Sequence, residues 1–273
     1  MTTYSRPKTK QKARPRWRSI ALPTEHGGWG FLLEPLLLGR LVAPSAAGLL
    51  LLIATVAAFL LRQPLKIVLV DRRRGQQSKR TEMARRFALL YALLALVAAV
   101  GALALAGPRF LLALACGLPF AAVFIYYDMT RPGRTLQAEL AAPLALATVA
   151  PAMALMDGWS WQAAAAMWGL LAARAVPSIL YVRARLRIDK EKEAGVYGPL
   201  LLHILAALIV FWLVELGLAP PLATLAFAAL LFVRAAVMLG PRRPRVSVKV
   251  IGFSELFIGI AFVVTVAIGY WRM

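Results

Sequence analysis

The densest run of charge in this sequence is YVRARLRIDKEKEAG at Tyr181–Gly195, which directly follows a long apolar segment. Asp189 and Glu193 stand four residues apart, so on a helix they share one face and can share a hard cation such as Mg²⁺. Guanidinium groups that suit phosphate oxygens lie beside them, on Arg183, Arg185 and Arg187. The same residues also fit a solvated turn in which bases and acids pair with each other. The spacing favours neither interpretation.

A second basic stretch, Arg62–Arg86, holds Asp71 as its one acid before the run RRRGQQSKR. One hypothesis is that Asp71 completes a metal site with Asp189 and Glu193, which gives these three carboxylates both metal-binding and catalytic roles. In the alternative, Arg72–Arg74 are an anchor on anionic lipid headgroups, and this explains most of the bases by itself.

Two further groups of residues are candidates for substrate binding. Arg131 and Arg134 flank a Pro-Gly turn in YYDMTRPGRT, where they suit a phosphate or serve only as positive charge that keeps a loop inside. His26 and Glu25 follow LPT in LPTEHGGWG, where they can act as acid, base or ligand. Trp29 and the glycines around it also fit the start of a helix at a membrane interface.

Ionisable residues also occur inside the apolar segments. An arginine at the centre of a membrane helix costs about 3 kcal/mol on insertion scales, so such groups usually pair or face a wet cavity. They predict either ion pairs between neighbouring helices or a substrate-binding cavity open to the cytoplasm. Because no second histidine lies in the same segment as His203, packing is the simpler role for that residue. The residues concerned are Glu34, Glu139, Arg174, His203, Arg234 and Glu255.

The composition indicates a polytopic membrane protein. Of 273 residues, 61% are hydrophobic and 16% are charged. This hydrophobic fraction exceeds the apolar content that one soluble core of this size needs. The net charge of +20 lies mostly in short basic stretches beside apolar segments, so anionic lipid headgroups, and not nucleic acid, are the expected partner. We expect a basic cytoplasmic tail at 1–18, with no signal peptide, and a single transmembrane domain at 19–273.

Dividing the chain into segments of about 20 apolar residues predicts nine transmembrane helices in an all-α bundle. With the N-terminus inside, twenty-seven of the 32 Lys and Arg residues fall in the tail and inner loops and three fall outside. This asymmetry predicts a cytoplasmic N-terminus and an external C-terminus. The predicted segments are 21–42, 46–70, 87–106, 109–127, 136–156, 160–182, 197–217, 219–239 and 250–271.

Several of these motifs resemble one family of bacterial membrane proteins. The stretch LPTEHGGWGFLLEPLLLG, with RQPLK, DRRRG and YVRARLR after it, is similar to the YwiC-like family over nearly the whole chain. The resemblance implies a multi-pass protein of the bacterial inner membrane.

The layout of nine helices with acid-bearing loops after the second and sixth resembles the UbiA superfamily of intramembrane prenyltransferases. That resemblance implies that Asp71 and the stretch Asp189–Glu193 bind Mg²⁺-diphosphate, with Gly195 and Arg131 at matching positions. Here the first aspartate-rich motif is reduced to Asp71 followed by three arginines. Arginines neutralise diphosphate, but they cannot replace carboxylates as Mg²⁺ ligands.

Three functions follow as expectations. The first is a UbiA-like transferase that acts on a lipophilic, prenyl-diphosphate-like anion at a cytoplasm-facing cavity, with Mg²⁺ as the candidate cofactor. The second is a non-enzymatic protein that binds a quinone, haem or lipid for respiratory assembly. The third is a transporter in which the intramembrane acids and arginines form a relay.

Overall fold

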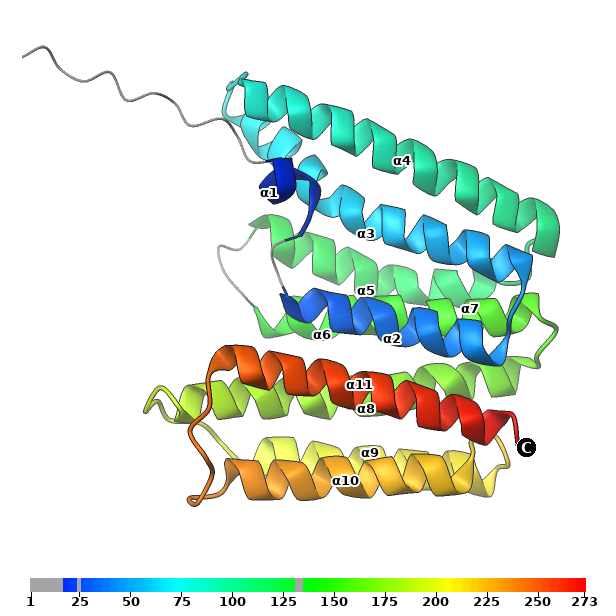
Figure 1. The fold of residues 1–273 in the computed structure, drawn as a ribbon, viewed down its shortest axis with the longest axis vertical. Coiled ribbons are helices and arrows are strands. Elements are labelled where there is room, and N and C mark those ends of the chain that lie inside the picture. Colours follow the sequence, from blue (N-terminus) through cyan, green and yellow to red (C-terminus); the bar gives the residue numbers. More distant parts are fainter. Residues whose placement is uncertain (1–16, 24–25, 131–134) are drawn as a thin grey trace, which may run out of the picture.

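The computed structural model describes residues 17–23, 26–130 and 135–273, and within these ranges the chain forms helices and no strand (Figure 1). The elements are α1 (Trp17–Ala21), α2 (His26–Val42), α3 (Ala46–Arg73), α4 (Lys79–Ala106), α5 (Leu111–Thr130), α6 (Leu136–Ala147), α7 (Val149–Met156), α8 (Trp161–Ile188), α9 (Tyr197–Glu215), α10 (Pro221–Leu239) and α11 (Val248–Tyr270).

Serine and threonine residues start many of these helices. In each case the side-chain oxygen accepts a hydrogen bond from a backbone N–H in the first turn, which satisfies a donor that has no partner within the helix. At the other end of α4, Gly107 takes a φ of 68°, a conformation that favours glycine and ends the helix. The N-capping residues are Ser45, Ser78, Thr135, Ser160 and Ser247.

Eight helical segments of the described chain are long and apolar enough to cross a membrane. They are α3, α4, α5, α6 together with α7, α8, α9, α10 and α11. The side chains of α4 that face outward are large and apolar, with Leu89, Leu93 and Leu96 each more than 60% exposed. Water is a poor solvent for such a surface, so a lipid bilayer is its environment. The prediction of a multi-pass helical membrane protein is therefore confirmed.

The first predicted segment, 21–42, corresponds to α2, which has 17 residues and is not among the eight. It begins at His26, five residues after the predicted start. Despite its length, α2 lies in the middle of the bundle, where it packs against α3, α6, α7, α8 and α11. Its Leu32, Leu36 and Leu38 belong to the main hydrophobic core.

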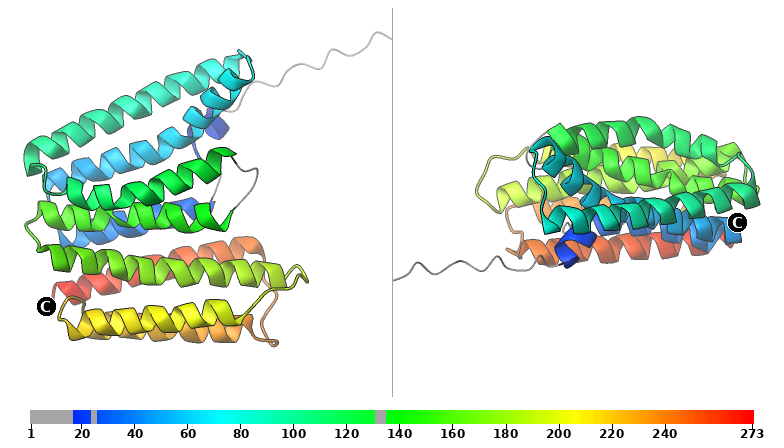
Figure 2. Two further views of the ribbon diagram at one scale, coloured as in Figure 1. Left: turned by 180° about the vertical axis from the view of Figure 1, so that it is seen from behind. Right: turned by 90° about the horizontal axis from the view of Figure 1, so that it is seen from above.

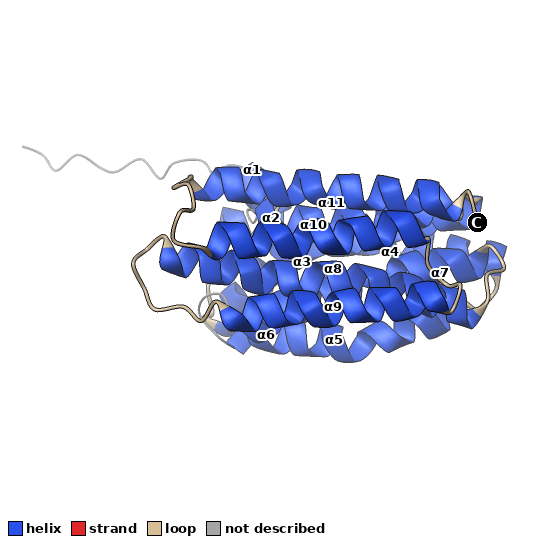
Figure 3. Cartoon of the chain, turned by 90° about the horizontal axis from the view of Figure 1, so that it is seen from below, coloured by secondary structure: helices blue, strands red, loops and turns tan. Residues whose placement is uncertain are grey.

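The helices run roughly side by side and form a slab, with the α3–α4 hairpin at one edge and the α9–α10 hairpin at the other (Figures 1 and 2). The connections 74–78, 189–196 and 240–247 lie at one end of the bundle, here called the loop end, and the C-terminus lies at the opposite end. The longest described connections are at the loop end (Figure 3).

Three helix boundaries differ from the predictions in ways that matter for the site. α8 continues to Ile188, so the three arginines of YVRARLR lie on its last turns and not in a loop. α4 starts at Lys79, within the basic stretch that was predicted to be a loop. Arginine and lysine are good helix formers, so a helix continues after its apolar run has ended. The predicted segment 136–156 is divided at Thr148 into α6 and α7.

Candidate functional site

Four charged side chains meet inside the bundle, and each comes from a different helix. Arg174 on α8 lies 3.0 Å from Glu34 on α2, measured from Nη1 to Oε1. Its Nη2 donates to the backbone oxygen of Glu255 on α11 over 2.8 Å and lies 4.0 Å from Oε2 of the same residue. Arg234 on α10 forms an ion pair and a hydrogen bond with Oε1 of Glu255. We call these four residues the buried ion network.

The buried ion network contains two positive and two negative charges and is almost closed to the outside. The side chains of Arg174 and Glu34 are 2% and 5% exposed. Charges in such surroundings are stable only when they are paired and hydrogen-bonded. The expectation of ion pairing between neighbouring helices is met here, and the pairs connect α2, α8, α10 and α11.

Two neighbouring residues, Gly259 and Tyr181, make room for the buried ion network and stabilise its charge. A Cβ built on Gly259 of α11 would lie 2.2 Å from Oε1 of Glu34 and 2.8 Å from Nη2 of Arg174, so only glycine leaves room for this pair. The guanidinium carbon of Arg234 lies 4.4 Å from the ring centre of Tyr181, an arrangement that favours a cation. Gly259 and Tyr181 had no predicted role.

A pocket of about 340 Å³ lies at the loop end between α6, α8 and α9. Its walls are mostly small or apolar, and Arg183 and Arg187 are the two bases in its lining. Since they are four residues apart on α8, they project from one face of the helix. The other lining residues are Leu136, Leu180, Ala184, Glu193, Ala194, Gly195 and Pro199.

The two arginines of this pocket differ in their partners. Arg183 hydrogen-bonds to Glu139 on α6, so the predicted intramembrane acid Glu139 is part of an ion pair. Arg187 donates from Nε to the backbone oxygen of Glu193 over 2.9 Å, and this contact holds the loop 189–196 against the pocket. Arg187 is exposed, and its two Nη nitrogens have no hydrogen-bond partner among the described residues. Its guanidinium therefore has donors left for a ligand.

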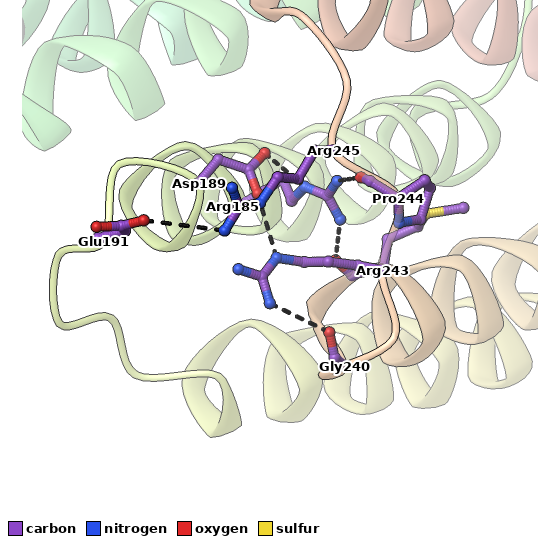
Figure 4. A network of polar contacts seen from close by, with 8 residues as sticks. Arg185, Asp189, Glu191, Gly240, Arg243, Pro244 and Arg245 are labelled. Carbon is purple, nitrogen blue, oxygen red and sulfur yellow. Dashed lines mark hydrogen bonds and ion pairs between the residues drawn. The ribbon is translucent and has the colours of Figure 1, made fainter.

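Arg185, which was predicted to bind phosphate, has a structural role instead. Its side chain is 1% exposed and bonds to the backbone oxygens of Met238 and Pro244 and to the carboxylate of Asp189 (Figure 4). Arg243 also donates to Asp189, over 3.2 Å. These contacts join the end of α8 to the last turn of α10 and to the connection between α10 and α11. Each of its three guanidinium nitrogens has a protein partner and the side chain is buried, so Arg185 is not accessible to a substrate.

The pKa of Asp189 is lowered by these two arginines. Partial burial alone raises it, but the hydrogen bonds and positive charges of Arg185 and Arg243 outweigh the burial. A carboxyl group with a lowered pKa in the folded state adds stability above its unfolded value of about 4, and this stability is lost as the pH falls through the folded value.

Replacing Asp189 by asparagine should lower the free energy of unfolding by about 1–2 kcal/mol at pH 7, because charge-assisted hydrogen bonds are lost. Unfolding in mixed micelles at a series of pH values measures this. The difference between the two proteins should stay constant above about pH 5 and shrink as the pH falls below about 4. A Glu82→Gln variant is the control, because Glu82 is exposed and its one ion-pair partner among the described residues is Arg86 of its own helix.

The carboxylates predicted to share Mg²⁺ do not come together in the described structure. Asp71 lies in the last turn of α3 and accepts a hydrogen bond from Thr81 over 2.6 Å. Asp189 follows α8, and α2, α5 and α6 lie between α3 and α8 in Figure 1. Within the described ranges, no group of three or more His, Cys, Asp or Glu side chains could hold a metal ion. Asp71, Asp189 and Glu193 therefore do not fit a common Mg²⁺ centre.

Other predicted residues have separate positions. His203 on α9 is 2% exposed, and its Nδ1 lies 2.7 Å from the backbone oxygen of Pro199. Glu25, Arg131 and Arg134 lie outside the described residues, as does the side chain of His26 at the start of α2.

Sequence reasoning missed one ion cluster entirely. Asp128 near the end of α5 accepts hydrogen bonds from Arg62 over 2.7 Å and from Lys66 over 2.9 Å, both on α3. The four-residue spacing of Arg62 and Lys66 was the available signal, since it places both on one face of a helix. The sequence does not indicate which acid they meet.

Residues 22–154 match a family model described as YwiC-like protein. These residues include α2 to α6 and most of α7, and so Glu34, but Arg174, Arg183 and Arg187 come after them. No curated protein and no solved structure matches the chain.

Proposed function

From the match of residues 22–154 to the YwiC-like family model, we propose that the chain binds a lipophilic anion in the loop-end pocket. The observation that carries the proposal is the pocket of about 340 Å³ with Arg183 and Arg187 in an otherwise largely apolar lining. Small-molecule sites typically combine apolar walls with a few polar groups that fix the orientation of the ligand.

The chemistry of the lining suits a ligand with a charged head and an apolar tail. Arg187 offers its Nη donors, which match the geometry of phosphate oxygens. Arg183 is shared with Glu139, so it adds less net charge to the pocket. Leu136 and Leu180 supply apolar surface for the first part of the tail. A prenyl diphosphate or a similar lipid anion has this combination of groups.

The proposal includes a topology in which this pocket faces the cytoplasm. A helix of 17 residues is about 26 Å long, and α2 lies between spanning helices, so we propose that it is the ninth crossing. Nine crossings put the two termini on opposite sides. The loop end carries most of the Lys and Arg residues, which favours its placement in the cytoplasm together with the N-terminus.

A UbiA-like transferase is the enzymatic form of this proposal. The Mg²⁺-dependent route is not part of it, because the described carboxylates do not form a shared centre. The arginines of the pocket can hold a diphosphate without metal, and the protein would then bind a prenyl donor beside a lipophilic acceptor. If the ligand is bound without reaction, the protein is a lipid-binding protein, as the second function predicted from the sequence requires.

Replacing Arg187 by glutamine should weaken binding of geranylgeranyl diphosphate about tenfold to a hundredfold. The change removes charge-assisted hydrogen bonds worth about 1.5–3 kcal/mol, and 1.4 kcal/mol corresponds to a factor of ten. Binding is measured by scintillation proximity on the purified protein in nanodiscs of zwitterionic lipid. Addition of phosphatidylglycerol as competitor tests whether a membrane lipid takes the same site.

Arg242→Gln is the matched control, because Arg242 is exposed at the same end of the bundle and does not line the pocket. Its loss should change the affinity less than twofold. Equal weakening by both variants would mean that only the general positive charge of the loop end attracts the ligand. Wild-type protein that binds no prenyl diphosphate and no phosphatidylglycerol would contradict the proposal. Formation of a new prenylated lipid from a radiolabelled donor would show that the protein is a transferase and not only a lipid-binding protein.

A further inference from the structure

A second, much smaller cavity lies deeper in the bundle. It has a volume of about 20 Å³ and is formed by α8, α9, α10 and one residue of α11. Most of its lining is alanine, leucine, valine or phenylalanine. Three polar side chains interrupt this surface: Arg174, His203 and Thr224.

Two nitrogens in this lining have no hydrogen-bond partner among the described residues. They are Nε of Arg174 and Nε2 of His203, and both side chains are 2% exposed. A buried polar atom without a partner costs about 1–3 kcal/mol, so native proteins usually supply one. The protein groups around the cavity do not supply it here.

The chemistry of the two nitrogens is complementary. Nδ1 of His203 lies 2.7 Å from the backbone oxygen of Pro199, and a carbonyl oxygen can only accept a hydrogen bond. Nδ1 therefore carries the proton, and in the neutral imidazole Nε2 is an acceptor. Nε of Arg174 is a donor. The cavity thus presents one donor and one acceptor, and Thr224, whose hydroxyl donates to Pro220 over 2.6 Å, adds an oxygen that can still accept.

We propose that this cavity is a hydration site within the membrane, in which water accepts from Arg174 and donates to His203. The volume supports water, because one molecule needs at least about 10–15 Å³ of such space. The charges support a neutral ligand, because Arg174 is already matched by Glu34 and Glu255. An anion here would lie near two carboxylates that have their own partners.

The water links His203 to the buried ion network through Arg174. The charged groups on neighbouring helices are Arg174 on α8, Arg234 on α10 and, through Arg234, Glu255 on α11. The site is separate from the loop-end pocket, with which it shares no lining residue. The proposal does not depend on what that pocket binds.

Solid-state NMR of protein labelled with ¹⁵N-histidine in liposomes tests the site. The chain has two histidines, and the signals absent from a His203→Gln sample belong to His203. At pH 8 we expect the Nδ1–H tautomer and transfer of magnetisation from water to the imidazole. An Nε2–H tautomer, or no transfer from water, would overturn the proposal.

A variant that fills the cavity provides the second measurement. Ala228→Leu places three more carbons in the lining and should abolish the transfer from water to His203, with a shift of the Nε2 resonance as its hydrogen bond is lost. Ala226→Leu is the matched control, because Ala226 lies on the same helix but is exposed and does not line the cavity. Unchanged transfer in Ala228→Leu would place the water elsewhere and contradict the proposal. If Ala228→Leu does not fold, the proposal is tested by the two wild-type measurements, the tautomer of His203 and the transfer of magnetisation from water.

Discussion

The Arg174→Leu variant is expected to lose about 3–5 kcal/mol of unfolding free energy, the usual cost of breaking a buried ion pair. Arg174 is 2% exposed, lies 3.0 Å from Glu34 and donates to the backbone of Glu255. Its removal leaves Glu34 with no positive partner among the described residues and leaves the backbone oxygen of Glu255 without its donor. Titration with sodium dodecyl sulfate, followed by circular dichroism, measures the loss.

The double variant Glu34→Leu/Arg174→Leu separates the ion pair from the packing of its side chains. It keeps the neutral Arg234–Glu255 pair and replaces two matched charges by apolar groups, which is often neutral or stabilising. The double variant should therefore recover most of the stability lost by Arg174→Leu. Arg109→Leu controls for the loss of an arginine, because Arg109 is exposed and should change stability by less than about 0.5 kcal/mol. A double variant as unstable as the single one would show that the pair itself is unimportant.

The buried ion network has a clear role in holding the slab together. Between helices in lipid there is little hydrophobic driving force, because lipid tails are as apolar as leucine. Polar contacts between helices, and close packing at small residues, therefore supply part of the stability of the bundle. The network joins α2, which is close to the middle of the slab, to α8, α10 and α11. It thus connects helices that are far apart in the sequence.

The helices were largely predictable, because hydropathy alone decides whether a segment can cross a membrane. The start of α3 at Ala46 and the end of α4 at Ala106 agree with the predicted segments. Helix ends within charged sequence were not predictable from hydropathy. The end of α8 at Ile188 is an example, since the apolar run stops before the helix does.

The site was less predictable, because hydropathy and residue spacing do not show which helices pack against each other. The charged residues of the apolar segments were expected either to pair or to face a cavity. Glu34–Arg174 and Glu255–Arg234 form pairs, while Arg174 also lines a small cavity. The shared metal site was inferred from a resemblance in loop order. In the described structure, the helices that carry Asp71 and precede Asp189, α3 and α8, do not pack against each other as neighbours.

Gly259→Ala is expected to destabilise the protein by about 3 kcal/mol, although alanine is normally the better helix former. The added Cβ would lie 2.2 Å from Oε1 of Glu34 and 2.8 Å from Nη2 of Arg174. Both are ends of flexible side chains, but they lie in a closed interior, so they can move only by separating from each other or by pushing α11 away. Either movement weakens the buried pair.

Gly252→Ala is the matched control on the same helix, because nothing lies within 4 Å of a Cβ at that position. It should stabilise the protein by about 0.5–1 kcal/mol through helix propensity alone. The mechanism is tested by adding Gly259→Ala to the Glu34→Leu/Arg174→Leu background, in the same detergent titration. If the methyl group acts by breaking the ion pair, its cost should fall by more than half there, because the pair is already absent. An unchanged cost would mean that Gly259 is needed for the approach of the helix backbones and not for the ion pair.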